Sequence, residues 1–428
     1  MSETAGASLV QDAYEEQKTR IDNIVNEMAS AEDTEQERVW KEHVDKYLKE
    51  IERYQSMIKL LDIGDEELSQ RTSVFLDILE NPEFEIAFVG TIKTGKSTLI
   101  NALLGHNFTP TDVTPETAAL TKFRRSEKDY IKIIFYNEEE WKELRASKSQ
   151  NAVEYNDLYK RLGAEEAAPK WIGHEAIKKE LDGNEIEEKV AQWTSSKYAE
   201  HFFVKEVELG ISTLPEWFPP QVLFVDTPGL FDAVQYRSEI AEKYIRKADA
   251  VFFCVDVQRT IREEHDEIQT VFANSNDNKS KVHIVATHWD KLNKPIVDNW
   301  KKQKRFFVEL FSNTNFFGSE ELAEKNILHS SAYMYNLCNH FDENIDELEI
   351  FARTLGLSVR GDDDEKIRGL KDQLLESTNI EKIKKVIETE LVVKYKQLMV
   401  DRIEKIYQEL VNNYRQGIRE KRMENESK

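Results

Sequence analysis

Residues 90–98 constrain this chain more than any other stretch, because they read Gly-Thr-Ile-Lys-Thr-Gly-Lys-Ser-Thr. They lie between an apolar stretch at 84–89, which predicts a strand, and a helical pattern at 99–104. In such a loop, glycines let backbone N–H groups close on phosphates, while Lys96 reaches the β- and γ-phosphates and Ser97 binds Mg²⁺. An ordinary glycine turn leaves the lysine and serine unexplained. We therefore predict nucleotide contacts from Gly90, Thr94, Gly95, Lys96, Ser97 and Thr98.

A second motif, Asp226-Thr227-Pro228-Gly229, follows the apolar stretch 222–225. An aspartate at a strand end can hold the ligand shell of Mg²⁺, so Asp226 joins Ser97 as a predicted metal ligand. The N–H of Gly229 can turn towards a γ-phosphate, which makes this residue a catalytic candidate. The two motifs together predict a nucleoside triphosphate bound with Mg²⁺.

Two later strand ends indicate the base. The stretch 282–290 ends in Thr287-His288-Trp289-Asp290, which resembles the guanine motif N/T-K-x-D, whose aspartate accepts two hydrogen bonds from the base. His288 stands where that motif has lysine, and an imidazole can stack on a purine in a similar way. Residues 326–332 resemble the last strand and the Ser-Ala loop of guanine sites. We predict binding of GTP and GDP, with contacts from Thr287, His288, Asp290, Ser331 and Ala332.

The composition limits the partners and locations to be considered. The 428 residues carry a net charge of −22, which argues against nucleic acid or an anionic bilayer as the main electrostatic partner. Two isolated cysteines fit a reducing cytosol. The N-terminus resembles no signal peptide, and no apolar run approaches about 18 residues. We expect a cytoplasmic protein, with peripheral contact at the inner face of a membrane left open.

Three regions follow from the patterns along the chain. Residues 1–80 are helical, residues 81–340 form an α/β domain with a mixed, mostly parallel sheet and helices on both faces, and residues 341–428 are helical again. About 138–200 form a helical insertion, either a contact surface or a decoration without function. Apolar residues at three- and four-residue steps mark a face in each flanking region, which indicates a helical bundle more than a separate coiled coil. These residues are Trp40, Val44, Tyr47, Ile51, Tyr54, Ile58 and Leu61, and then Ile380, Ile383, Ile387, Leu391, Tyr395, Leu398, Ile406, Leu410 and Tyr414.

The motifs and their order resemble the dynamin superfamily of P-loop GTPases, and bacterial dynamin-like proteins, including the LeoA-like branch, most of all. Residues 108–121 resemble a switch in which a Pro-x-Thr-Ala segment supplies a threonine to Mg²⁺. Thr117 fits that position best, and Thr114 is the alternative. The resemblance covers 82–335 by motif, and implies that the flanking helices form a neck.

The resemblance also implies how the site works. Leu230 stands where Ras-like enzymes carry a water-orienting glutamine, so catalysis needs another group. At the position of Lys93, atlastins and guanylate-binding proteins carry an arginine that acts as a finger in cis, and a lysine there can neutralise developing charge. The alternative is that Lys93 faces solvent or pairs across a dimer. Lys93, Lys96, Thr117 and Gly229 are thus the predicted catalytic residues.

Three functions remain open at this stage. The first is a GTP hydrolase that dimerises through its nucleotide domain and couples turnover to movement of its neck, in membrane remodelling or secretion. The second is a nucleotide-gated interaction protein with little turnover, which recruits a membrane or protein partner through the insertion or the helices. The third, a ribosome-associated GTPase of the Era type, is disfavoured because the chain is acidic and shows no basic RNA-binding module.

Overall fold

The computed structural model describes residues 46–56, 59, 66–80, 83–108, 119–147, 153–182, 185–218, 222–230, 235–259, 261–275, 278–357 and 364–426. It divides the chain into two compact units. The sheet unit is Glu85–Leu391, and the helical unit joins Met1–Phe84 to Val392–Lys428. The sheet unit therefore continues past the boundary expected at 340. The cause is that the helices which follow that position pack on the sheet unit.

A nine-stranded sheet forms the centre of the sheet unit within the described residues, in the order β4-β3-β5-β2-β6-β1-β7-β8-β9. β1, β7, β8 and β9 pair in parallel, whereas β2 pairs antiparallel with β6, and β3 pairs antiparallel with β5 and β4. This is the mixed, mostly parallel sheet expected from the sequence. The strands are β1 (Phe84–Val89), β2 (Leu120–Arg125), β3 (Tyr130–Phe135), β4 (Ile177–Glu180), β5 (Val204–Ile211), β6 (Val222–Asp226), β7 (Ala250–Asp256), β8 (Val282–Thr287) and β9 (Ile327–His329).

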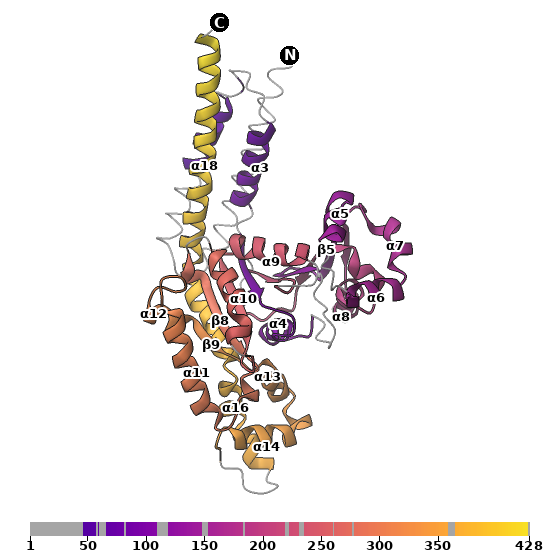
Figure 1. Ribbon diagram of the computed structural model, residues 1–428, viewed down its shortest axis with the longest axis vertical. Helices are drawn as coiled ribbons and strands as arrows, with labels where there is room; N and C mark the ends of the chain where they lie inside the picture. Colours follow the sequence, from indigo (N-terminus) through magenta and orange to yellow (C-terminus); the bar gives the residue numbers. More distant parts are fainter. Residues whose placement is uncertain are drawn as a thin grey trace. The chain divides into compact units, whose positions relative to one another are not determined.

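Strands β1, β7 and β8 are buried along nearly their whole length because both faces of the parallel region are covered. One face contributes Val89, Val251 and Phe253 to a cluster with helices α9, α10 and α11. On the other, the rings of Phe88, Phe224 and Phe252 stack or meet edge to face. The main helices around the sheet are α4 (Lys96–Leu104), α9 (Gln235–Lys247), α10 (Ile261–Ala273), α11 (Ile296–Phe311), α12 (Glu320–Asn326) and α13 (Ala332–Asn339) (Figure 1).

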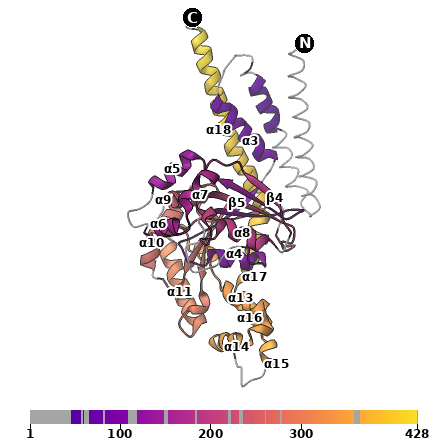
Figure 2. The same ribbon diagram turned by 90° about the vertical axis from the view of Figure 1, so that its right-hand side faces the viewer.

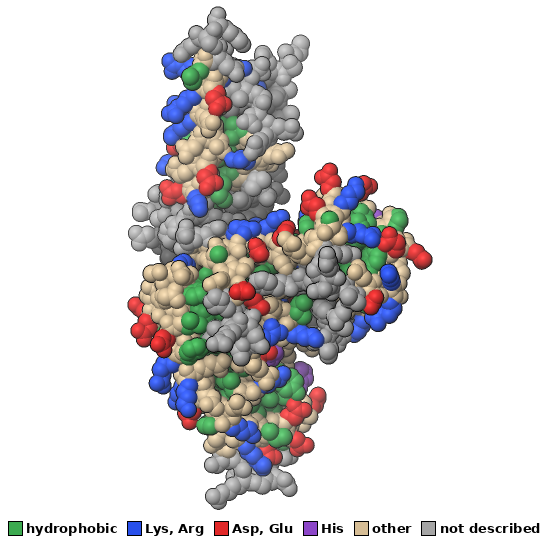
Figure 3. Space-filling view, in the orientation of Figure 1, with side chains coloured by type: hydrophobic (Ala, Val, Ile, Leu, Met, Phe, Trp, Pro, Cys, Tyr) green, Lys and Arg blue, Asp and Glu red, His purple; other side chains and the backbone are tan. Residues whose placement is uncertain are grey.

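The insertion contains helices, as expected. It also contains an edge strand, which the sequence did not predict. β4 pairs antiparallel with β3, so the insertion extends the sheet. The rings of Phe135, Trp171 and Trp193 pack at 5.1–5.7 Å and give the insertion an aromatic core. Acidic and basic side chains are interspersed over its visible surface (Figure 3). Its helices are α5 (Glu138–Ala146), α6 (Val153–Arg161), α7 (Ala164–Trp171) and α8 (Ile186–Thr194).

Four of the α-helices described after residue 340 belong to the sheet unit. Leu348, Ile367 and Leu374 are buried in the same cluster as the helix-covered face of the sheet. These helices are α14 (Ile345–Thr354), α15 (Asp364–Arg368), α16 (Lys371–Ser377) and α17 (Ile380–Lys385), and a π-helical segment, Val386–Val392, follows. The apolar stripe expected over 380–414 is therefore shared between the two units.

The helical unit pairs α3 (Glu66–Glu80) and a helix over 46–56 with α18 (Val393–Glu426) (Figure 2). The ring of Tyr47 lies 4.3 Å from that of Tyr407, and Tyr54 stacks on Tyr414 at 5.4 Å. The expected packing of the flanking helices on each other is thus confirmed. Trp40, Val44, Ile58 and Leu61 lie outside the described residues. Among the described helices, none combines the length and apolar character needed to cross a bilayer.

Candidate functional site

The loop between β1 and α4 has a backbone that its glycines make possible. A Cβ on Gly90 would lie 2.6 Å from the carbonyl oxygen of Cys254 and 2.7 Å from Oγ1 of Thr94, so only glycine fits. Gly95 has a left-handed φ of 78° and caps the start of α4. The first N–H groups of α4 therefore face the hollow of the loop without helical partners, which suits an anion.

Lys96 is buried in this loop, with 6% of its surface exposed. Its Nζ donates hydrogen bonds to the carbonyl oxygens of Gly90 at 3.0 Å and Thr91 at 2.8 Å. Burial lowers the pKa of Lys96, and the Asp226 carboxylate opposes this effect. The ammonium is thus held against the loop, where a phosphate would be an additional anionic partner.

Ser97 and Asp226 meet beside the loop. The hydroxyl of Ser97 donates to Oδ2 of Asp226 at 2.9 Å. Asp226 is fully buried, and its Oδ1 has no hydrogen-bond partner within the part of the chain that the structure describes. Burial raises the pKa of Asp226 to about 6, although Lys96 and the Ser97 hydroxyl act in the opposite direction. A hydroxyl and an unpaired buried carboxylate oxygen are the hard donors that Mg²⁺ takes, so the residues fit this metal.

The segment after Asp226 lies directly on the phosphate loop. The N–H of Leu230 donates to the carbonyl oxygen of Gly90 at 3.1 Å, and the Leu230 side chain is 1% exposed. A Cβ on Gly229 would lie 2.9 Å from Cγ1 of Ile92 and 3.3 Å from its backbone nitrogen, so a larger residue here would force Ile92 to move. Thr117 and Thr114, the alternatives for the switch threonine, lie outside the described residues.

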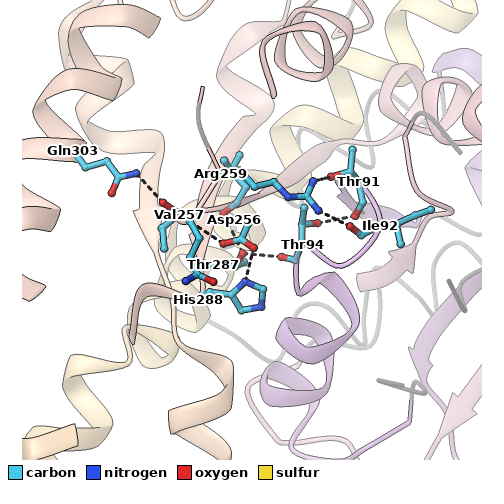
Figure 4. Close-up of polar contacts among 11 residues, drawn as sticks. Thr91, Ile92, Thr94, Asp256, Val257, Arg259, Thr287, His288 and Gln303 are labelled. Atoms are coloured by element: carbon cyan, nitrogen blue, oxygen red, sulfur yellow. Dashed lines mark hydrogen bonds and ion pairs between the residues drawn. The ribbon is translucent and has the colours of Figure 1, made fainter. Parts of the chain in front are cut away.

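The predicted base-binding residues gather at the ends of β8 and β9. The Ser331 hydroxyl donates to Oδ1 of Asp290 at 2.5 Å, and the same hydroxyl caps α13, which begins at Ala332. His288 has a left-handed φ of 55°, and its Nε2 would lie 3.3 Å from a Cβ on Gly95. Its ring therefore lies against the phosphate loop, and its Nδ1 pairs with Oδ2 of Asp256 at 3.1 Å (Figure 4).

Thr287 has a different environment from the one expected. Its hydroxyl lies 2.7 Å from the carbonyl oxygen of Thr94 and 3.0 Å from that of Val255. It therefore ties β8 to the phosphate loop and to β7. A direct contact from Thr287 to a nucleotide stays a prediction, as do the roles of Thr98 and Ala332.

Comparison with known proteins gives this arrangement a family. Residues 86–289 match the model described as the dynamin family. The match spans just under half of the chain, and it shows that these residues are similar to the dynamin family. The resemblance inferred from the motifs is thereby confirmed, while the LeoA-like branch stays a prediction.

Individual relatives agree with this assignment. Dynamin-like protein 1 of Campylobacter jejuni is 28% identical over 230 residues, which cover 54% of this chain and 30% of that protein. The bacterial dynamin-like protein of Nostoc punctiforme is 28% identical over 175 residues, which cover 41% of this chain and 20% of that protein. The chain therefore matches less than half the length of either relative.

A solved structure of an oligomerised bacterial dynamin pair aligns with a TM-score of 0.51 and 20% identity. The alignment covers 87% of this chain and 56% of that chain. At this identity the likeness shows the fold alone.

Three further residues lie around the site and belong to none of the predicted motifs: Asp256, Arg259 and Glu267. Asp256 ends β7 and Arg259 follows it, whereas Glu267 is a buried residue of α10. No motif spacing marks them. The one available signal was a polar residue at the carboxyl end of a parallel strand, next to the ends that carry the other motifs.

Proposed function

We propose that the protein binds GTP and hydrolyses it with Mg²⁺. The observation that carries this proposal is the contact of Ser97 with the buried Asp226 beside the phosphate loop, because it joins a phosphate site to a magnesium site. The similarity of residues 86–289 to the dynamin family supports it. Asp290, held by Ser331, is the group that would accept hydrogen bonds from guanine.

Each residue has a role in the proposal. Bound Mg²⁺, held by Ser97 and Asp226, would neutralise phosphate charge. Lys96 binds the β- and γ-phosphates, and the N–H of Gly229 stabilises the γ-phosphate. Lys93, exposed on the loop, places a second cation near the bond that breaks. The buried Leu230 has no side-chain group to orient water, so stabilisation of developing charge carries more of the catalysis.

Dimerisation through the nucleotide domain and movement of the neck are part of the same proposal. The bacterial dynamin pair is described as sensing and tethering membranes over a long range. By analogy, we propose a cytoplasmic protein that contacts a membrane or a protein partner peripherally.

The competing proposal is a nucleotide-gated interaction protein with little turnover, which the burial of Leu230 favours. Turnover that rises more than linearly with protein concentration supports the first, and tight binding with negligible turnover supports the second.

Nucleotide selectivity tests the site directly. Adenine offers no donors for Asp290, and a carboxylate left unpaired on binding is costly. We expect GTP to bind at least about a hundredfold more tightly than ATP, from roughly 3 kcal/mol of discrimination. Asp290→Ala should lose this selectivity, and Asp298→Ala, which changes an exposed aspartate of α11, should retain it. Equal affinity of the parent for ATP, or unchanged selectivity in Asp290→Ala, would overturn the assignment.

A further inference from the structure

Arg259 forms hydrogen bonds with the first part of the phosphate loop, at Thr91 and Ile92. It lies just after β7, and its guanidinium makes two hydrogen bonds to consecutive loop residues (Figure 4). Nη1 donates to Oγ1 of Thr91 at 2.7 Å, and Nη2 donates to the carbonyl oxygen of Ile92 at 3.0 Å. Both acceptors directly precede Lys93. The side chain therefore restrains the part of the loop from which Lys93 projects.

The bond to the Ile92 carbonyl bears on the conformation of Lys93. That oxygen belongs to the peptide between Ile92 and Lys93, so holding it fixes the plane from which Lys93 continues. Lys93 has a left-handed φ of 68°, which is unfavourable for a residue with a Cβ. Such a conformation persists only where the surroundings determine it. The guanidinium supplies this restraint from outside the loop.

The segment that carries Arg259 is itself held in place. The N–H of Arg259 donates to the carbonyl oxygen of Asp256 at 3.0 Å, and the N–H of Gln258 donates to Oδ1 of Asp256 at 2.9 Å. The N–H of Val257 donates to the carbonyl oxygen of Thr287 at 3.2 Å. The turn at 256–259 is thus bonded to β8, which fixes the backbone position from which the Arg259 side chain extends.

A buried carboxylate lies near the same contact. Glu267, on α10, is 8% exposed and lies close to Arg259, Lys96 and the Thr91 hydroxyl. Burial raises the pKa of Glu267 to about 7, although these three groups act in the opposite direction. When ionised, Glu267 provides a counter-charge that helps keep the guanidinium turned towards the loop.

We propose that Arg259 is a positioning residue. It fixes the backbone of the phosphate loop at Thr91 and Ile92, and thereby the direction in which the Lys93 side chain points. Arg259 acts through Lys93 and does not bind the nucleotide. Arginine suits this task, because its planar fork presents two donors in a fixed geometry, whereas lysine presents a point charge. The inference rests on the proposed role of Lys93 in hydrolysis.

A double-mutant cycle tests the inference in the full-length protein. Steady-state GTP hydrolysis and GDP affinity are measured for the parent, Arg259→Ala, Lys93→Ala and the double variant. Arg259→Ala should lower kcat by about tenfold or more and leave GDP affinity within about threefold. In the Lys93→Ala background the same change should lower kcat by no more than about twofold, because the residue through which Arg259 acts is gone. Arg305→Ala, an exposed arginine of α11, is the matched control and should leave kcat unchanged.

A second measurement does not depend on turnover. Hydrogen exchange of the amides at 91–94 is compared without nucleotide in the parent, Arg259→Ala and Arg259→Lys. We expect exchange to accelerate by about tenfold in the alanine variant and by less in the lysine variant, which can reach one acceptor. If the alanine variant does not fold, Arg259→Lys replaces it in both measurements, with a smaller loss of kcat.

The outcomes separate the inference from the function on which it rests. A parent that binds GTP without hydrolysing it removes the proposed function, and the exchange measurement then still decides whether Arg259 restrains the loop. Unchanged exchange at 91–94 would overturn the inference. So would a loss of kcat that is equally large with and without Lys93, because Arg259 would then act independently of that residue.

Discussion

At the scale of single residues, the site depends on cations held near the phosphate loop, and the two lysines have different environments. Lys96 is buried and bonded to the loop, whereas Lys93 is exposed. The motif pattern predicted that Lys96, Ser97 and Asp226 lie together, and the structure places them at the phosphate loop, while their contacts with phosphate and Mg²⁺ stay predictions. Arg259 could not be predicted in this way, since its partners are a side-chain hydroxyl and a carbonyl oxygen that only the folded loop brings together.

Substitution of the two lysines should therefore have different effects. Lys93→Ala should keep nucleotide affinity within a few-fold and lose turnover on the order of 10²-fold, less than the 10³–10⁵ supplied by an arginine finger. Lys96→Ala should lose binding itself. The measurements are equilibrium binding of GDP and steady-state hydrolysis at a protein concentration that permits dimers. Hydrolysis by Lys93→Ala within about threefold of the parent would contradict the role of Lys93. So would a strict potassium requirement in the parent, because the Lys93 ammonium should take the place of a monovalent cation beside the phosphates.

Glu267 should make stability depend on pH. Folded, it keeps its proton up to about pH 7, and unfolded it releases the proton near its ordinary value of 4.5. The folded state thus binds more protons between these values, so the free energy of unfolding should fall as pH rises from 4.5 to 7. Glu267→Gln removes this contribution, which amounts to at most about 3 kcal/mol. Urea unfolding without nucleotide at pH 5 and pH 7.5 should show a flatter dependence in Glu267→Gln than in Glu309→Gln, an exposed control. Equal slopes would count against this account.

At the scale of elements, the insertion is joined to the helix that follows the Asp226–Leu230 segment. The N–H of Gln235, the first residue of α9, donates to the carbonyl oxygen of Ser147 at 3.3 Å, and that of Tyr236 donates to the Ser147 hydroxyl at 3.1 Å. The apolar spacing predicted the helices of the insertion. It could not predict β4, because Ile177–Glu180 is a short edge strand with only one apolar residue.

Arg237 provides a test of this junction. It is 6% exposed, and its guanidinium lies 5.3 Å from the ring centroid of Tyr155 on α6. Arg237→Ala should lower the free energy of unfolding by on the order of 1–3 kcal/mol, because a buried charge-aromatic contact is lost. Hydrogen exchange should accelerate in both α6 and α9. Arg246→Ala, on the same helix but exposed and bonded to Asn274, should leave α6 unchanged. Acceleration confined to α9 would show that the insertion is independent of that helix.

At the scale of the whole molecule, the chain combines a sheet unit, of which residues 86–289 are similar to the dynamin family, with a helical unit formed by Met1–Phe84 and Val392–Lys428. The sequence predicted that the two flanking regions pack on each other, because each carries an apolar face. It placed the end of the sheet unit at 340, where the alternation of strands and helices gives way to a helical pattern. Periodicity alone does not show which surface those later helices cover. Tyr407, one residue from the expected Ile406, is among the buried residues of α18.

The packing of the helical unit predicts a response at a distance. Ile51 is 1% exposed, and burial of a large apolar side chain contributes roughly 1.5–3 kcal/mol. Ile51→Asp should therefore accelerate hydrogen exchange in α18 as well as in its own helix. Glu52→Asp, at an exposed position of the same helix, should change neither. Exchange that accelerates only around residues 46–56 would indicate that the N-terminal helix folds separately.

The most direct test of the central claim is steady-state hydrolysis of GTP and of ATP by the parent protein with Mg²⁺, over a range of protein concentrations. We expect GTP to be hydrolysed and ATP to be hydrolysed at least about a hundredfold less efficiently. We also expect the turnover per molecule to rise with protein concentration. Tight binding of GTP without turnover at any concentration would contradict the claim of catalysis, and equal use of ATP would contradict the assignment of the site to guanine.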